Sequence, residues 1–238
     1  MRSFHFSVLL AFLGFTLTSC LFMGPSVKGD GNVKEETRVV GDFHGIRVTS
    51  GMTVHLVQGD EPGVKVIADK NLHKLIETRV ENDILEIRAL ANIWKASEKK
   101  VIVTVSDLSE ITGTAGSNIR SDNQLVTDHL EVRGSAGSNI RIDIEGEKME
   151  VSASSGANIF LEGLVREMNV KTSSGANVKA GDIHALRCDA RASSGGNIWI
   201  SVQNDLTADA SSGGNIFYSG SPDTLNVNSS SGGNIIKK

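Results

Sequence analysis

Basic and aromatic side chains recur at one fixed position in the C-terminal half of this 238-residue chain, directly after an Asn-Ile or Asn-Val pair. If the Ile or Val points into a core, the next side chain points outward, because side chains alternate along a strand. A row of exposed rings and cations can bind sugar rings or a protein partner. The alternative is that the rings stack on one another or lie under a neighbouring loop or subunit. The candidate stripe comprises Arg120, Arg141, Phe160, Lys179, Trp199 and Phe217, and the last copy of the pattern carries Ile236.

Sequence motifs of catalysis and metal binding are absent. The chain has no nucleophile elbow, no His-Glu-x-x-His pair, no Cys-x-x-Cys pair and no P-loop. Its six histidines are scattered, at positions 5, 44, 55, 73, 129 and 184, and the five beyond the first are expected at surfaces or edges. Cys188 alternates with Ala190 and Ala192 along a predicted strand, so all three side chains should point into the core. We therefore expect Cys188 to be a small buried side chain and not a reactive thiol. We expect no cofactor and no metal.

The first twenty residues have the pattern of an export signal. Arg2 precedes an apolar stretch, residues 8–17, that is too short to span a bilayer, and Leu17-Thr18-Ser19-Cys20 follows. This arrangement resembles a bacterial lipoprotein signal, in which cleavage precedes Cys20 and the cysteine is acylated. We expect an exported protein, anchored to the bacterial outer membrane by lipid on Cys20. The alternative is an ordinary secretory signal, and either form exports the chain.

Charge and composition exclude two classes of partner. The net charge is −4, and both signs are interspersed along the chain, so the sequence has no basic run for nucleic acid or anionic lipid. Only 5% of residues are aromatic, while 39% are apolar, which predicts a thin core of small and branched side chains.

The stripe residues follow a repeated phrase built on Gly-x-Asn-Ile. Its asparagines are separated by 21, 19, 19, 20, 18 and 19 residues, a period typical of stacked coils. Asparagines at equivalent positions of successive coils can hydrogen-bond to one another in a ladder, and we expect Gly and Asn to take unusual backbone conformations at the corner. The ladder asparagines are Asn118, Asn139, Asn158, Asn177, Asn197, Asn215 and Asn234.

Alternating apolar residues precede each glycine, as in Met149, Val151 and Ala153, and predict a strand with one buried face. Stacked coils of this kind form a single-stranded parallel β-helix, with about three sides per coil and about 4.8 Å between coils. We expect a right-handed coil from the preference of parallel crossovers. Leucine-rich, hexapeptide and nonapeptide repeats are excluded because their frames and subperiods are missing.

The N-terminal half carries the same plan in diverged form. Ile46, Val48, Gly51 and Thr53 match one further coil, in which Thr53 replaces the ladder asparagine. Strands are expected at 63–68, 84–89 and 101–105, with a helical turn near 71–76. The predicted organisation is a signal (1–19), a lipidated tether (20–37) and a β-helix domain (38–238), divided into an irregular cap with the diverged coil (38–110) and seven regular coils (111–238). The last coil has no obvious cover, and such an edge invites pairing with a second copy.

These features together resemble the putative auto-transporter adhesin head GIN domain family. The resemblance rests on the Gly-x-Asn-Ile repeats behind the signal, on Phe43-His44-Gly45-Ile46-Arg47-Val48, and on the stretch from Asp69-Lys70-Asn71-Leu72 through Ile87. It covers roughly residues 39–220. It implies a β-helical domain on exported bacterial proteins, called adhesin-like for its shape, and it brings no catalytic or ligand residues.

The predicted function is that of a non-enzymatic, lipid-anchored, adhesin-like protein of the cell envelope, whose rigid surface binds carbohydrate or protein. The alternative is a periplasm-facing structural or assembly factor. A polysaccharide-active β-helix enzyme is a further alternative, but the candidate carboxylates do not align at equivalent repeat positions with a partner Arg or Lys, and glycoside hydrolysis needs two carboxylates at a defined separation. These candidates are Asp143, Glu145, Glu162, Asp182 and Asp209.

Overall fold

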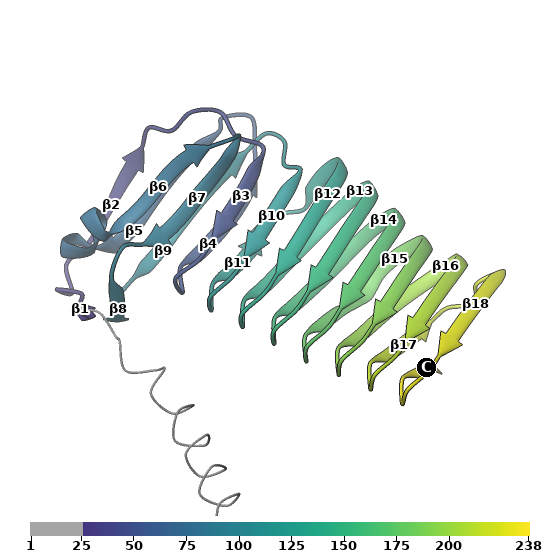
Figure 1. The fold of residues 1–238 in the computed structure, drawn as a ribbon. Helices are drawn as coiled ribbons and strands as arrows, with labels where there is room; N and C mark the ends of the chain where they lie inside the picture. The colour runs from purple at the N-terminus through teal and green to yellow at the C-terminus, as the bar shows by residue number, and fades with distance from the viewer. Residues whose placement is uncertain (1–25) are drawn as a thin grey trace, which may run out of the picture.

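The computed structural model describes residues 26–238. The predicted signal, Cys20 and the start of the tether lie outside the described residues. The described chain is all-β apart from one short 3-10 helix, and it forms an irregular block of strands followed by a regular solenoid (Figure 1). The predicted fold class, a parallel β-helix with an irregular N-terminal cap, is confirmed, and its right-handed sense stays a prediction.

The solenoid strands all pair in parallel. The register is regular except for shifts in the β14–β15 and β15–β16 pairs. Long strands run through most of a coil, while the first and last coils are split into two strands. Their bounds are β10 (Glu110–Gly113), β11 (Asn118–Ser121), β12 (Leu125–Gly134), β13 (Asn139–Ala153), β14 (Asn158–Thr172), β15 (Asn177–Ala192), β16 (Asn197–Ala210), β17 (Asn215–Ser219), β18 (Thr224–Ser229) and β19 (Asn234–Lys237).

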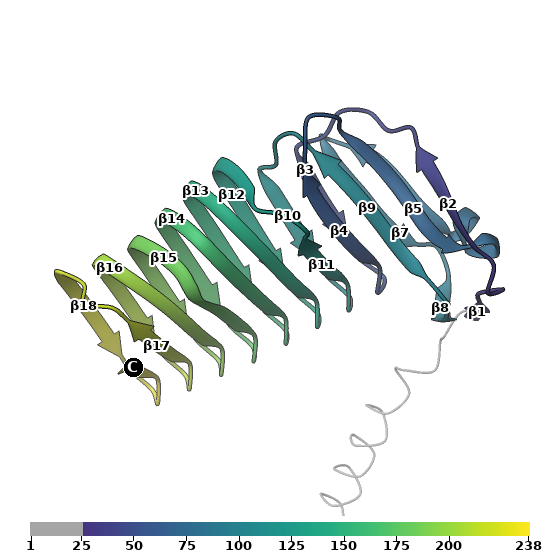
Figure 2. The same ribbon diagram turned by 180° about the vertical axis from the view of Figure 1, so that it is seen from behind.

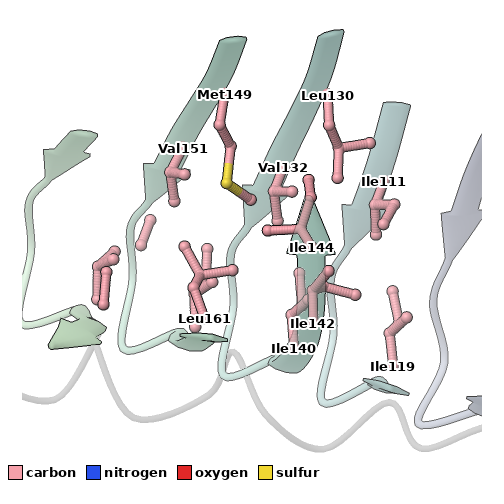
Figure 3. Packing of buried hydrophobic residues seen from close by; sticks show 14 of the residues in the cluster. Ile111, Ile119, Leu130, Val132, Ile140, Ile142, Ile144, Met149, Val151 and Leu161 are labelled. Carbon is pink, nitrogen blue, oxygen red and sulfur yellow. The ribbon is translucent and has the colours of Figure 1, made fainter. Parts of the chain in front are cut away.

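Each coil consists of two long arms that face each other across the core, where three sides were expected. In β13, the first arm buries Ile140, Ile142 and Ile144, and the second arm buries Met149 and Val151. Figure 3 shows the side chains of the two arms meeting between the strands. The exposed residues 145–148 form the bend between the arms. Aliphatic side chains and Met149 fill the gap in this coil, and Tyr218 is the aromatic residue of the described core.

The other edge of each coil is a four-residue corner. In Ser154–Ala157, the N–H of Ala157 donates to the carbonyl of Ser154 at 3.0 Å, and Ser155 and Gly156 have φ values of +49° and +73°. Two consecutive positive φ values are the pattern of a type I′ turn, whose twist matches the strands on either side. The expectation for glycine is confirmed, but the second left-handed residue is the Ser or Ala before it, and not the asparagine, which already begins the next strand.

The asparagine ladder is confirmed and is continuous. Each Asn Nδ2 donates to Oδ1 of the asparagine one coil earlier, at distances from 2.9 to 3.3 Å, from Asn139–Asn118 through Asn234–Asn215. The corners are also linked by backbone hydrogen bonds that run in the opposite direction, since Gly156 N–H donates to the carbonyl of Ser174 in the next coil at 3.2 Å. The Ile or Val after each asparagine is buried in every coil but the last, where Ile235 is half-buried.

The cap contains the remaining strands and the 3-10 helix, and it includes antiparallel pairs β2–β5, β5–β9 and β6–β7. The diverged coil is confirmed as β3 and β4, because Thr53 pairs with Asn118 and Ser50 and Gly51 both have positive φ. The bounds are β1 (Ser26–Lys28), β2 (Val33–Arg38), β3 (Gly45–Val48), β4 (Thr53–Gln58), β5 (Gly63–Asp69), η1 (Lys70–Leu75), β6 (Ile76–Glu81), β7 (Ile84–Ala89), β8 (Asn92–Lys95) and β9 (Lys99–Val105).

The boundary expected at residue 38 was placed too late. β1 pairs with β8, and β2 pairs with β5 along its whole length, so residues 26–37 belong to the cap and not to a tether. Almost every side chain of β2 is exposed. An edge strand held by backbone hydrogen bonds leaves no hydrophobic pattern in the sequence, which explains the error.

Candidate functional site

The strand register brings the candidate stripe into one column on the outer face of the first arm. Each residue is the direct register partner of the next, one coil apart. The column runs along the solenoid axis through Arg120, Arg141, Phe160, Lys179, Trp199 and Phe217.

Phe160 lies between two cations. The guanidinium carbon of Arg141 and the Nζ of Lys179 are each 5.0 Å from the centre of its ring. Both distances are within the range of a cation–π interaction. The ring therefore has a cation on each neighbouring coil.

Trp199 and Phe217 stack directly on each other, with ring centres 5.2 Å apart and planes 15° apart. Lys179 Nζ lies 5.9 Å from the Trp199 ring, and Lys238 Nζ lies 4.9 Å from the Phe217 ring. The rings are half-buried, while Lys179 and Lys238 are exposed. Of the two arrangements considered for the rings, the structure has the one in which they stack on one another.

The outward surface of the stripe is therefore formed by ring edges and cations. Arg120 is paired with Asp122 at 3.0 Å. Arg141 and Lys179 are exposed, and neither has an ion-pair partner among residues 26–238. Such cations are free to contact an anionic group on a ligand.

His55 is a further member of the column that was not predicted. It is the register partner of Arg120, and its Nδ1 lies 3.0 Å from Asp122 Oδ2. The sequence carried a signal for it, because His55 follows Thr53-Val54 as each stripe residue follows its Asn-Ile pair. A groove of about 190 Å³ lies beside it, with Arg120, Arg141 and Phe160 in its walls.

The expectation that no candidate carboxylate aligns at an equivalent repeat position with a partner Arg or Lys was wrong for Asp209 alone. Asp143, Glu162 and Asp182 are register partners on β13, β14 and β15, and Asp209 pairs with Arg191, with Nε to Oδ2 at 3.8 Å. Asp143 and Glu162 each stand four residues after a ladder asparagine, while a register shift between β14 and β15 moves Asp182 by one residue. Glu145 lines a hollow in the bends together with Asp107, Asp128 and Glu147. Within residues 26–238 no cluster of three His, Cys, Asp or Glu side chains could hold a metal ion.

One histidine departs from the expected surface position. His73 is 8% exposed, and its Nε2 lies 3.1 Å from the carbonyl of Lys34 and 3.2 Å from that of Ala68. Its Nδ1 lies 3.1 Å from Glu36. These contacts join η1 to β2 and β5, so His73 has a structural position in the cap.

Cys188 is buried as predicted. Desolvation raises the pKa of its thiol to about 12, so it stays protonated and unreactive near neutral pH. The helical part of residues 26–238 is confined to η1, and nothing in it has the length and hydrophobicity that a membrane span requires.

Comparisons with known proteins agree with this fold. The sequence profile described as "Putative auto-transporter adhesin, head GIN domain" matches residues 42–222. A solved structure of a putative adhesin from Bacteroides fragilis has 18% identity and a TM-score of 0.80, and the match covers 89% of this chain and 100% of that one. Two further putative adhesins, from Parabacteroides distasonis and Parabacteroides merdae, have 19% and 18% identity and TM-scores of 0.73 and 0.69, each over 90% of this chain and 100% of theirs. None of the curated proteins matches the chain.

Proposed function

The chain belongs to the putative auto-transporter adhesin head GIN domain family, and from this premise we propose that it is a lipid-anchored, adhesin-like, non-enzymatic envelope protein whose stripe binds acidic carbohydrate. The family indicates the broad class, an adhesin-like protein of the cell envelope. The anchor on Cys20 and the ligand are the specific parts of the proposal.

The observation that carries the ligand class is the pairing of half-buried rings with unpaired cations along one axis. Neighbouring stripe residues cover the faces of the aromatic rings, so only the ring edges remain for contact with a ligand. The edge of an aromatic ring carries positive partial charge. With Arg141 and Lys179 beside them, these edges favour carboxylate or sulfate groups. A linear polymer of acidic sugars presents such groups repeatedly, as the stripe presents its cations.

The ladder contributes rigidity to this surface. Backbone hydrogen bonds fix every coil to the next. A ladder asparagine, two residues before each stripe position, adds a side-chain hydrogen bond. A surface that is already ordered loses little conformational entropy when it binds. Weak contacts repeated over several coils can then add up, as in multivalent binding.

The experiment is affinity electrophoresis of the purified protein in gels containing polygalacturonate, a polymer of uronic acid, with dextran as the neutral control. We expect retardation by polygalacturonate alone, and we expect it to weaken as salt is added, because exposed charges are screened. Arg141→Gln and Lys179→Gln should each reduce the affinity by about 2- to 5-fold, the range of one exposed ion pair.

Lys171→Gln is the matched control. Lys171 is exposed on the outer face of the second arm and has no ion-pair partner among the described residues. Equal losses for Lys171→Gln and Lys179→Gln would show that net charge, and not the stripe, determines binding. No retardation by polygalacturonate would contradict the proposed ligand class.

The open end of the solenoid favours a second candidate function, as an assembly factor in the envelope. β18 pairs only with β16, and β19 only with β17, and the apolar side chains of Leu225, Val227 and Ile236 are 44%, 51% and 45% exposed. A parallel edge with exposed apolar groups can add a strand from another chain. Crosslinking from Val227→Cys in cells would test it, and a chain that captures no neighbour would contradict it.

A further inference from the structure

A small apolar patch lies at the end of the molecule opposite the open coil. Leu90 and Trp94, which we call the β8 patch, are 54% and 60% exposed. Trp94 lies on β8, which pairs in parallel with β1, the first described strand. Figures 1 and 2 show β1 and β8 at the opposite end of the molecule from β18. Trp94 and Leu90 are four residues apart in the chain, and both side chains are more than half exposed.

Four exposed lysines lie on β1, β8 and η1, the elements next to this patch. Lys28 is the register partner of Lys95, which follows Trp94 directly. The N–H of Leu90 donates to the carbonyl of Leu75, the neighbour of Lys74, at 2.8 Å. The fourth is Lys70, at the start of η1, whose N–H donates to the carbonyl of Asn32 at 2.9 Å. None of the four has an ion-pair partner among residues 26–238.

Acidic groups do not neutralise this end. Asp30 is exposed in the same segment, and Glu98 lies 3.8 Å from Lys100. Asp69 is fully buried beneath the patch and accepts hydrogen bonds from backbone N–H groups. Glu36 lines a hollow with Lys70 and Lys74, but it is paired with Arg38 at 2.9 Å. Four unpaired lysines against one unpaired exposed carboxylate, Asp30, leave the surface positive.

The patch is held rigidly by its neighbours. Asp69 accepts the N–H groups of Gly31 and Ser97 at 3.2 and 3.1 Å, on either side of the β1–β8 pair. Asn71 accepts the N–H of Asp30 at 3.0 Å and donates to the carbonyl of Lys28 at 2.8 Å. These contacts tie β1 and β8 to η1 and β5, so the apolar and basic groups keep a fixed arrangement.

The position of the patch along the chain identifies its partner. Ser26, the first residue of β1, is six residues from Cys20. Six extended residues span about 20 Å at most. An acyl chain on Cys20 would therefore keep β1 and β8 close to the headgroup layer. Tryptophan favours that layer, and lysines near it are attracted to lipid phosphates.

We infer that the β8 patch docks on a phospholipid surface, with Trp94 and Leu90 at the level of the headgroups and the four lysines at the phosphates. This inference rests on the proposed acylation of Cys20. It also revises the expectation that the chain has no site for anionic lipid, because lysines at positions 28, 70, 74 and 95 gather only in the folded protein. Docking at this end holds the cap at the membrane and leaves the opposite end of the solenoid free.

The chain is suited to a direct test because it has two tryptophans, Trp94 and Trp199. The full chain, produced in an exporting bacterium, is reconstituted into vesicles of phosphatidylethanolamine and phosphatidylglycerol with or without brominated lipid. Trp199→Phe leaves Trp94 as the sole indole, and Trp94→Phe is the matched control that leaves Trp199. We expect brominated lipid to quench Trp94 and leave Trp199 unchanged.

Flotation of the same vesicles separates the two hypotheses. A chain that floats with the vesicles while Trp94 is unquenched leaves the lipid anchor standing and overturns the docking inference alone. A chain that stays out of the vesicle fraction contradicts the anchor and the docking together. Replacing the four lysines by glutamine should reduce the quenching of Trp94, and unchanged quenching would overturn their assignment to lipid phosphates.

Discussion

Asn177 donates a hydrogen bond from its Nδ2 to Oδ1 of Asn158 at 3.0 Å, and its own Oδ1 accepts one from Asn197 at 3.0 Å. The central asparagines of the ladder are thus donor and acceptor at once. Replacing Asn177 removes both hydrogen bonds, so Oδ1 of Asn158 loses its donor and Nδ2 of Asn197 loses its acceptor in the ladder.

We expect Asn177→Ala to lower the free energy of unfolding by about 1 to 3 kcal/mol, the cost of leaving such groups unsatisfied. Urea denaturation measures the change. Asn204→Ala is the control, since Asn204 is exposed in the bend of β16 and should change stability by less than about 0.5 kcal/mol. Equal curves for the two variants would contradict a stabilising ladder.

Replacing either of two corner glycines by alanine should lower the stability, for a different physical reason in each case. Gly175 has φ of +71°, and a Cβ built on it meets no atom within 4 Å, so Gly175→Ala should cost about 1 to 2 kcal/mol through conformation alone. A Cβ on Gly214 would lie 2.5 Å from the backbone of Ala192, so Gly214→Ala must displace the neighbouring coil. We expect the second variant to be less stable in thermal melts, and the reverse order would refute this account of the corner.

The stacked rings of Trp199 and Phe217 should be energetically coupled. A double-mutant cycle with alanine at both positions should give a coupling energy of about 0.5 to 1.5 kcal/mol. Because the rings are only half-buried, the double variant should still fold and melt in one transition. Binding to polygalacturonate should fall in the same variant, and intact binding would remove the rings from the proposed site.

Burial of Cys188 predicts low reactivity and a pH effect. With Cys20→Ser as background, a thiol reagent at pH 8 should label Cys188 in urea but not in buffer. The folded-state pKa of about 12 lies above the unfolded value near 9, so the native state retains its proton while the unfolded chain loses it. The contribution of Cys188 to stability is therefore full below pH 9 and declines from pH 9 to pH 12. Rapid labelling of the native protein would contradict the packing.

The buried carboxylate of Asp69 predicts a local effect in the cap. Asp69→Ala leaves the N–H groups of Gly31, Ser97 and Glu98 without their acceptor. We expect faster hydrogen exchange at these amides, with the solenoid amides unchanged, because the lost contacts lie only in the cap. Loss of protection throughout the solenoid would show instead that Asp69 stabilises the whole chain.

The regular half of the fold was predictable because its information is local. The spacing of the Gly-x-Asn copies set the coil, and the alternation of Met149, Val151 and Ala153 set the buried face. Parity also placed Cys188 inside. The same local counting missed β2, whose exposed side chains give no pattern, and the burial of His73, which depends on contacts from β2 and η1.

The sequence by itself determined the repeat, the ladder and the column of stripe residues, because stacking identical coils brings equivalent residues together. The tertiary structure alone decided how that column is used. It stacked Trp199 on Phe217, aligned Asp209 with Arg191, and paired Lys28 with Lys95, the residue after Trp94. These relationships depend on the distances between side chains on neighbouring coils and on neighbouring elements of the cap. Those distances are fixed only in the folded chain, by the bends, where coil lengths differ, and by the strand pairing of the cap.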